Sequence, residues 1–215
     1  RGRLVVVLAV VVSAVVSYLF VVLTVLPWSN PTGMMVSVDS PVYYNWISHM
    51  RSVDVYSALS FAFGNDRALF LVFCYALSFV ASLESVIQFA AALLLLLLAV
   101  VSVLVLRLFT SSRKVWVLGA LLVPFSFQGL GLIYSGYFAN MLALILIFGY
   151  VVLFFRLLEK WSSLAFFALL GISVLVLFSH SWTWFVFALS LAMFLFLVWR
   201  LAVHNRGLWG RFEEK

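Results

Sequence analysis

The sequence is short of charged residues. Asp, Glu, Lys and Arg make up 9% of its 215 residues, whereas hydrophobic residues make up 67%. A soluble globular domain is about half apolar and about a quarter charged, so this chain would leave too much apolar surface in water. The scarcity of charge excludes an ordinary soluble domain. It predicts an all-α polytopic membrane protein, with residues 1–215 forming a single transmembrane domain.

Cysteine and proline are scarce as well. Cys74 is the single cysteine, which excludes an internal disulfide and a metal site made of several thiolates. It lies in an apolar run, so we expect it to pack as a small hydrophobe. Three of the four prolines fall between residues 27 and 41, and Pro124 falls inside a later apolar run, where it predicts a kinked helix.

Acidic residues are fewer than basic ones. Seven Asp and Glu stand against 13 Lys and Arg, a net charge of +6. In a membrane protein the common cause is basic residues that hold cytoplasmic loops against anionic lipid. We therefore expect the lipid bilayer as a partner and no nucleic acid. The eight Trp and eight Tyr suit a chain that crosses headgroup layers many times.

Long apolar runs dominate the chain. The first run is 23 residues long, which exceeds the ~7–15 of a signal-peptide core and predicts a retained span. The predicted spans cover residues 4–26, 86–106, 115–133, 141–155, 164–178 and 184–199. Between the first two, residues 27–85 form a mixed outer segment with amphipathic helices. Residues 201–215 form an amphipathic tail that we expect on the cytoplasmic surface.

The segment Ala68–Leu83 leaves the number of crossings open. Its 16 residues are short for about 30 Å of hydrocarbon, so it is either a seventh span or a re-entrant or interfacial helix. Eleven of the 13 Lys and Arg lie inside with either count, so the positive-inside rule does not decide. The short length favours six spans. The loops at 27–85, 134–140 and 179–182 then share the outer face, and both chain ends are cytoplasmic.

The polar stretch after the first span holds the leading candidate site. Asp39 lies just past the membrane exit and precedes a cluster of aromatic and amide side chains. Pro41 suits the first turn of a short helix, which predicts Asp39 or Ser40 as its N-cap, the structural alternative to a catalytic carboxylate. The side chains expected on one face of this helix, lying on the membrane, are Tyr43, Tyr44, Trp46, Ile47 and Met50.

Other polar residues near the predicted membrane boundaries have two readings each. Arg51 either meets a phosphate or anchors the chain at the interface, and Asn140 either binds a ligand or caps a helix. His180 is either a functional group at the membrane boundary or a histidine satisfied by neighbouring hydroxyls. The candidate substrate-binding residues are Tyr43, Tyr44, Asn45, Arg51, Asn140, His180 and Trp182.

Taken together, three segments resemble the GT-C membrane glycosyltransferases, which include oligosaccharyltransferase catalytic subunits and the protein-mannosyltransferase-like proteins common in archaea. The first segment is the outer loop with Asp39 and the Tyr-rich helix after span 1. The second, Ser135–Leu142, is similar to the second outer loop of that family. The third, Phe178–Thr183, resembles the His-containing outer helix end of its archaeal members. The likeness covers nearly all 215 residues, and it lies in the pattern of the sequence more than in identical residues.

The resemblance implies transfer of a sugar from a polyprenyl-phosphate-linked donor to an acceptor on the outer face of the cell membrane. The first-loop aspartate of the family works at the catalytic centre as a base or metal ligand, and Asp39 holds that position. The implied metal is a divalent cation, Mg²⁺ or Mn²⁺. However, Ala139 and Asn140 stand where the oligosaccharyltransferases carry acidic residues, which argues against a full metal site.

Two further functions stay open. The missing acidic residues suit a non-catalytic scaffold that binds other membrane subunits. A small transporter ranks third, because the apolar spans carry few polar residues and no intramembrane charge pair. The family's enzymes extend well beyond 215 residues, so we expect this sequence to be a fragment of a longer protein.

Overall fold

The structure is a computed structural model that describes residues 2–24, 26–28, 30–31 and 37–213. Every regular element in these residues is a helix, which confirms the all-α prediction. The elements are α1 (Gly2–Leu23), α2 (Ser40–Ser52), α3 (Val55–Phe63), α4 (Ala68–Leu77), α5 (Leu83–Phe109), α6 (Arg113–Leu122), the 3₁₀ turn η1 (Val123–Phe125), α7 (Phe127–Ser135), α8 (Phe138–Glu159), α9 (Ser163–Ser179) and α10 (Ser181–Glu213).

Five helical segments are long and apolar enough to cross a membrane. They are Leu4–Leu23, Leu83–Phe109, Arg113–Leu132, Phe138–Glu159 and Ser181–Arg200. The predicted span at 164–178 is helix α9, whose 17 residues extend about 26 Å at 1.5 Å per residue. It falls below the length of the other five and is slightly shorter than the hydrocarbon core.

The third of these segments is broken at Pro124, as the sequence predicts. Helix α6 ends at Leu122, one 3₁₀ turn carries the proline, and α7 starts again at Phe127. The hydroxyl of Ser126 accepts a hydrogen bond of 3.0 Å from the backbone N–H of Gly129 and caps the new helix. Because proline lacks the amide proton that would continue the ladder, the span becomes two short helices.

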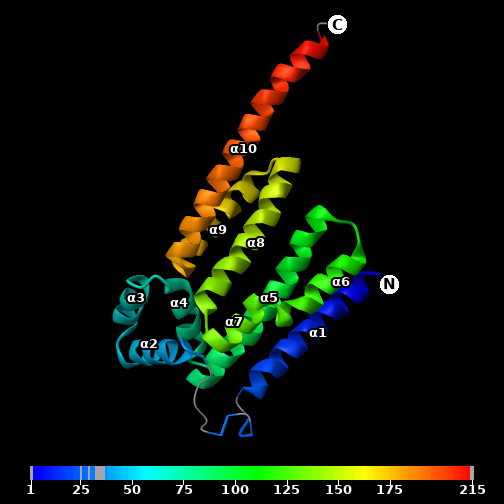
Figure 1. The fold of residues 1–215 in the computed structure, drawn as a ribbon. Coiled ribbons are helices and arrows are strands. Elements are labelled where there is room, and N and C mark those ends of the chain that lie inside the picture. The colour runs from blue at the N-terminus through cyan, green and yellow to red at the C-terminus, as the bar shows by residue number, and fades with distance from the viewer. Residues whose placement is uncertain (1, 25, 29, 32–36, 214–215) are drawn as a thin grey trace.

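Helices α2, α3 and α4 form a small group at one end of the bundle (Figure 1). Helix α4 has 10 residues and is about 15 Å long, half of a bilayer core, which fits the interfacial alternative better than a crossing. The expected membrane face of α2 is instead turned into the protein. Tyr43, Ile47 and Met50 are all at most 1% exposed, because α4, α5 and α8 supply apolar partners for them.

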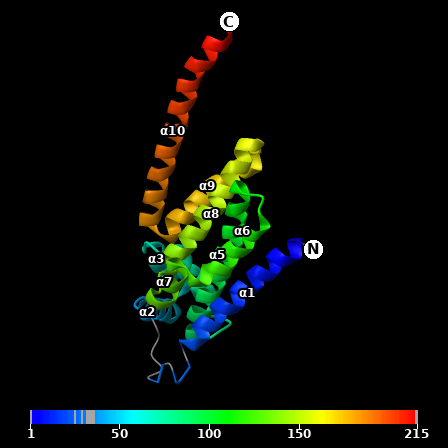
Figure 2. The same ribbon diagram turned by 45° about the vertical axis from the view of Figure 1, so that its right-hand side comes forward.

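Helix α5 lies at the centre of the bundle, with α1, α6 and α8 packed on it. Its buried side is made mostly of alanine and leucine, such as Ala90, Leu95 and Ala99. Helix α10 packs on α9 and α8 and then leaves the bundle, as two views show (Figures 1 and 2). It passes the predicted boundary at residue 200 without a break and continues to Glu213, whereas the side chains of 201–215 lie outside the described part.

Candidate active site

The first and second polar loops meet at the end of the bundle that carries α2. The backbone N–H of Asp39 donates a hydrogen bond of 3.3 Å to the carbonyl of Ser135. Gly136 follows with φ +74, and a Cβ there would lie 2.7 Å from the hydroxyl oxygen of Ser37 and 3.1 Å from the Cβ of Asp39. Only glycine combines this backbone conformation with this close approach, so the glycine allows the two loops to touch.

Asp39 precedes α2, but its side chain does not cap the helix. The carboxylate makes no hydrogen bond to the first turn. Ser37 does so instead, since its hydroxyl accepts a 3.1 Å hydrogen bond from the backbone N–H of Ser40. Ser37 reaches this position with φ 125, a backbone region that costs about 1–3 kcal/mol for a residue with a side chain. Asp39 therefore occupies the predicted N-cap position of α2, but its carboxylate does not make the capping hydrogen bond and has another partner.

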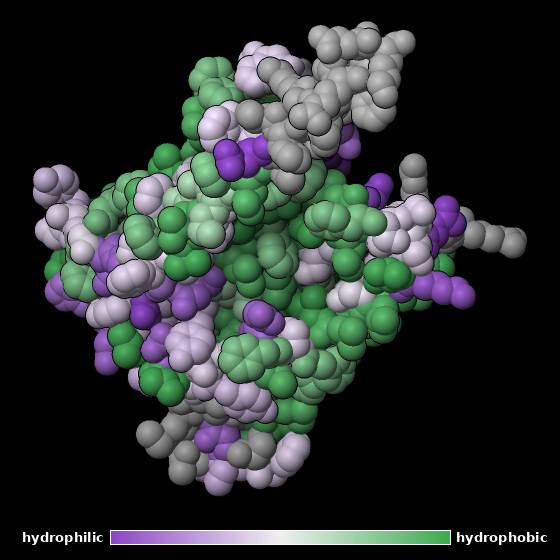
Figure 3. Space-filling model, turned by 45° about the horizontal axis from the view of Figure 1, so that its top comes forward, coloured by the Kyte–Doolittle hydropathy of each residue, from purple (hydrophilic) through white to green (hydrophobic). Residues whose placement is uncertain are grey.

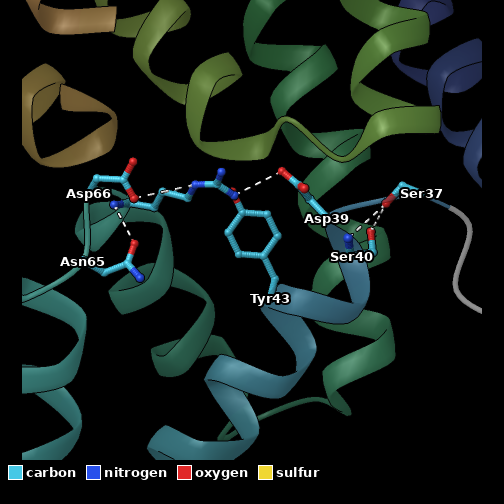
Figure 4. A network of polar contacts seen from close by, with 7 residues as sticks. Ser37, Asp39, Ser40, Tyr43, Asn65 and Asp66 are labelled. Carbon is cyan, nitrogen blue, oxygen red and sulfur yellow. Dashed lines mark hydrogen bonds and ion pairs between the residues drawn. The ribbon is translucent and has the colours of Figure 1, made fainter. Parts of the chain in front are cut away.

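That partner is Arg67, at the start of α4. Its Nη1 lies 3.1 Å from Oδ2 of Asp39 and also donates a 3.1 Å hydrogen bond to the hydroxyl of Tyr43. Its Nε is 3.8 Å from Oδ1 of Asp66. The carbon of the guanidinium group lies 5.8 Å from the ring centre of Trp46. The arginine is thus held by two carboxylates (Figure 4), and it also lies near the aromatic ring of Trp46.

Tyr43 stands at the base of this cluster and is only 1% exposed. Its ring packs edge-on against Phe70 at 4.9 Å between centres and lies 5.6 Å from Phe138. Burial raises the pKa of Tyr43 to about 12, although Arg67 and the backbone of Ala139 lower it. The phenol is therefore neutral and joins α2, α4 and α8. Stacking of this ring on a sugar would require its exposure.

His180 occupies the junction of α9 and α10. Its Nδ1 accepts a 3.2 Å hydrogen bond from the backbone N–H of Thr183, which leaves the proton of the neutral ring on Nε2. Burial lowers the pKa of His180 below its ordinary value, the charge of Asp66 opposes this, and the charge of Arg67 adds to it. The side-chain hydrogen bonds of His180 in the described residues go to Thr183, within its own loop.

The remaining predicted site residues fall around the cluster or away from it. Asn140 is half-buried in the first turn of α8, after Ala139. Tyr44 is half-buried, and Asn45 and Trp182 are exposed. Arg51 lies near the far end of α2, with its guanidinium 5.8 Å from the ring centre of Phe79. The structure thus brings Asp39 and Tyr43 together on Arg67, whereas no hydrogen bond or ion pair of the described residues joins His180, Asn140 or Arg51 to them.

Arg67 is the residue that sequence reasoning missed. Its partner Asp39 is 28 positions earlier, beyond the reach of any local pattern. The sequence did hold one indication of Arg67, because charged residues are rare in this chain. Arg51 and Arg67 are the two basic residues of the predicted outer face. A half-buried arginine needs a carboxylate, and Asp39, Asp54 and Asp66 were the aspartates of that segment.

A divalent cation does not fit these residues. In the described residues, no three His, Cys, Asp or Glu side chains lie close enough to hold a metal ion. The one carboxylate of the expected position already faces a guanidinium at 3.1 Å, whose charge repels a cation. Asp54, a second carboxylate of this segment, caps α3 by accepting a 3.1 Å hydrogen bond from the backbone N–H of Ser57. The cation of this cluster, Arg67, is of the type that binds anions, and two carboxylates hold it in this structure.

The basic side chains of the other loops lie at the opposite end. The α5–α6 and α8–α9 connections point away from α2–α4 in both views (Figures 1 and 2). The exposed basic residues on them are Arg107, Arg113, Lys114, Arg156 and Lys160. The bundle therefore has one end with a paired, partly buried arginine and one end with solvent-exposed positive charge.

Comparisons of the whole sequence and structure with other proteins yielded no relative: no protein-family model, curated protein or solved structure matches this chain.

Proposed function

We propose that this chain is the membrane module of a GT-C-type glycosyltransferase, which transfers a sugar from a polyprenyl-phosphate donor to an acceptor. The observation that carries the proposal is the contact between the loop of Asp39 and the loop of Ser135, beside the Asp39–Arg67 pair. The resemblance names both of these loops, and they come together although they are distant in sequence. The carboxylate is not used as a helix cap; its partner is the Arg67 guanidinium, whose departure would free it for chemistry.

The proposed orientation follows from the two ends of the bundle. The five exposed basic residues of the α5–α6 and α8–α9 connections would face the cytoplasm under the positive-inside rule. The Asp39–Arg67 cluster would then lie at the outer face of the cell membrane. Six crossings, with α9 as the short one and α4 as an interfacial helix, place both chain ends inside. An outer-facing site suits an acceptor outside the cell.

The chemistry needs a base and a group that stabilises the leaving phosphate. The Asp39 carboxylate would take the proton of an acceptor hydroxyl, while the oxygen of that hydroxyl forms a bond to C1 of the sugar. The bond between C1 and the phosphate oxygen breaks, and the electron pair stays on the lipid phosphate. Arg67 would turn from Asp39 to that phosphate and stabilise its charge. One movement of the guanidinium thus frees the base and binds the leaving group.

The surrounding polar groups supply contacts for a sugar or a phosphate. The neutral ring of His180 has an N–H on Nε2 to donate, and Asn140 offers an amide next to the cluster. Tyr44, Asn45 and Trp182 are accessible enough to contact the sugar or the acceptor. Arg51 lies too far along α2 to share the phosphate in this arrangement, so we assign that contact to Arg67.

The proposal is tested by transfer from a panel of radiolabelled polyprenyl-phosphate hexoses in proteoliposomes that contain the whole protein. Asp39→Asn keeps the size of the side chain and should lower the rate by about 10²–10⁴-fold, as expected for loss of a general base. The matched control is Asp54→Asn, which removes a charge from the same outer segment and should transfer at the wild-type rate. Equal rates for wild type and Asp39→Asn would contradict the proposed base.

A scaffold subunit is the second candidate, because the cluster also holds several helices together. Arg67 joins α2 and α4 through Asp39 and Tyr43, and Tyr43 in turn contacts α8. Under this reading Asp39→Asn would destabilise the assembly with other membrane subunits. The wild-type protein would transfer sugar from none of the donors.

A further inference from the structure

Two carboxamide side chains open into one hollow between α7 and α8. The hollow has a volume of about 160 Å³, and its lining includes Phe127, Gln128 and Gly131 of α7 and Asn140 of α8. Gln128 is exposed and Asn140 is half-buried. No hydrogen bond or ion pair of the described residues involves the side-chain amide of either one. The hollow therefore presents two amides that this chain leaves without a partner.

Gln128 belongs to a segment that is apolar enough to cross the membrane. It falls within Arg113–Leu132, one of the five such segments. It is the second residue of α7, and Ser135 is the last, so about 10 Å of helix separates Gln128 from the loop that contacts Asp39. An amide without a hydrogen-bonding partner is costly in hydrocarbon. We therefore expect the Gln128 amide to bond to a group outside this chain.

The surface around Gln128 leaves room for another helix to come close. Gly131 lies one turn further along α7, and a Cβ added there would meet nothing within 4 Å. Phe127 and Leu130 flank it and are 86% and 39% exposed. The face of the molecule in Figure 3 is mostly hydrophobic, with few hydrophilic side chains in its hollowed centre. Small residues and interhelical hydrogen bonds are the features by which membrane helices associate.

The chemistry of the amide favours a second copy of this chain as the partner. A carboxamide is its own complement, because its oxygen accepts a hydrogen bond and its nitrogen donates one. Copies inserted in the same direction carry Gln128 at the same depth. A twofold axis along the membrane normal brings the same surface of two copies together, so each amide meets its equivalent. A hydrocarbon chain in the hollow would offer the amide no such bond.

We propose that this protein pairs with a second copy of itself through α7. The Gln128 amides of the two copies bond to each other across a twofold axis, and the helices cross closely at Gly131. Asn140 borders the same hollow and supplies a further amide beside the pair. The interface does not use the Asp39–Arg67 pair, so it stands or falls independently of sugar transfer.

The test measures association of the whole protein in liposomes by energy transfer between donor-labelled and acceptor-labelled copies. The labels are attached at Ser111→Cys, in the exposed α5–α6 connection, in a Cys74→Ser background. The protein-to-lipid ratio is lowered in steps, which separates a specific pair from copies that are close by chance and gives a dissociation constant.

Two variants probe the interface, and each has a matched control. Gln128→Leu removes the amide and makes the surface more apolar. Its control is Gln88→Leu near the start of α5, which removes the chain's other glutamine amide. Gly131→Leu fills the space that a partner helix would need. Its control is Gly171→Leu in α9, where an added Cβ likewise meets nothing within 4 Å.

We expect the wild type and both controls to associate with the same dissociation constant. Gln128→Leu and Gly131→Leu should each raise that constant by about 10-fold or more, with the helical content of all variants unchanged in circular dichroism. Because leucine is more apolar than glutamine, weaker association of Gln128→Leu would point to the hydrogen bond and not to general apolar adhesion.

Three results would overturn the pairing through α7. The first is wild-type energy transfer no higher than that of randomly distributed copies, which would mean that another group meets the amide. The second is equal association of wild type, Gln128→Leu and Gly131→Leu, which would place the contact on a different face. The third is a loss in Gly171→Leu as large as that in Gly131→Leu.

Discussion

The two ends of this bundle differ in the surroundings of their basic side chains. At the end with α2–α4, Arg67 is 24% exposed and paired with Asp39, which is 19% exposed. At the other end, Arg107, Arg113 and Lys114 stand in solvent, and the described residues give them no ion pair within 4 Å. Arg107 instead lies over the ring of Trp116, 5.3 Å from its centre.

This contrast shows how one residue type serves two purposes in a membrane protein. A partly buried guanidinium is stabilised by specific partners, so its removal leaves those partners unsatisfied. An exposed one interacts with water and lipid headgroups, and many side chains can replace it. Mutations at the first end should change stability and activity, whereas mutations at the second should change neither.

The largest effect is expected for Gly136→Ala. The new methyl group would meet Ser37 and Asp39 in a left-handed backbone conformation, at a cost of about 3 kcal/mol. Thermal unfolding in detergent should show a clear loss of stability, and transfer should fall. The control is Gly149→Ala in α8, where a Cβ meets nothing within 4 Å and the helix gains up to about 1 kcal/mol. Equal stability of the two variants would contradict the close contact of the loops.

The second largest effect on stability is expected for Arg67→Met. It leaves the Asp39 carboxylate and the Tyr43 hydroxyl without their shared donor, and we expect about 2 kcal/mol of destabilisation because the site is only partly buried. The double variant with Asp39→Asn should cost less than the sum of the single changes, which unfolding measurements on all three proteins can test. Strict additivity would show that the pair is not coupled.

Tyr43→Phe should have a smaller effect at neutral pH, about 1 kcal/mol for one hydrogen-bonded hydroxyl. Its effect depends on pH. The folded protein keeps the phenol protonated up to a pKa of about 12, whereas the tyrosine of the unfolded chain ionises at its ordinary pKa of 10.0. Stability from this group is therefore complete below pH 10 and is lost as the pH rises from 10 to 12.

The ultraviolet absorbance of tyrosinate follows this titration directly. The difference between wild type and Tyr43→Phe should titrate near pH 12. A difference that titrates near pH 10 would show that the ring is exposed to water and not buried between the helices.

The smallest effect is expected for Arg113→Gln at the basic end. The side chain is exposed, and no ion pair of the described residues includes it, so thermal stability and transfer should equal those of the wild type. A loss as large as that of Arg67→Met would remove the distinction between the two ends.

The sequence predicted the helical class, the positions of five long apolar segments and the break at Pro124. These features follow from local chemistry, because lipid forces the backbone into helices and proline interrupts them. The sequence also predicted the short helix after Asp39. However, it predicted that the apolar face of that helix lies on the membrane, whereas Tyr43 and Ile47 are buried in the protein. Composition alone does not show whether lipid or protein is the apolar partner of these side chains.

The cluster itself was only half predictable. Asp39 stood out because acidic residues are rare in this chain, and Tyr43 because it follows closely. Arg67 did not, since its place beside Asp39 depends on how α4 packs against α2. The capping of α2 by Ser37 was equally hidden, because it requires a φ of 125 that no preference for serine predicts.

The contact between Asp39 and Ser135 also has a consequence for synthesis of the protein. The two residues are about a hundred positions apart in the chain: the helices from α2 to α6 lie between them, and Ser135 ends α7. The first loop is therefore made well before the second, and several helices are synthesised between them. A ribosome stalled before residue 135 would hold a chain whose Asp39 has no second loop beside it. The hydrogen bond between Asp39 and Ser135 can form only after residue 135 has been made.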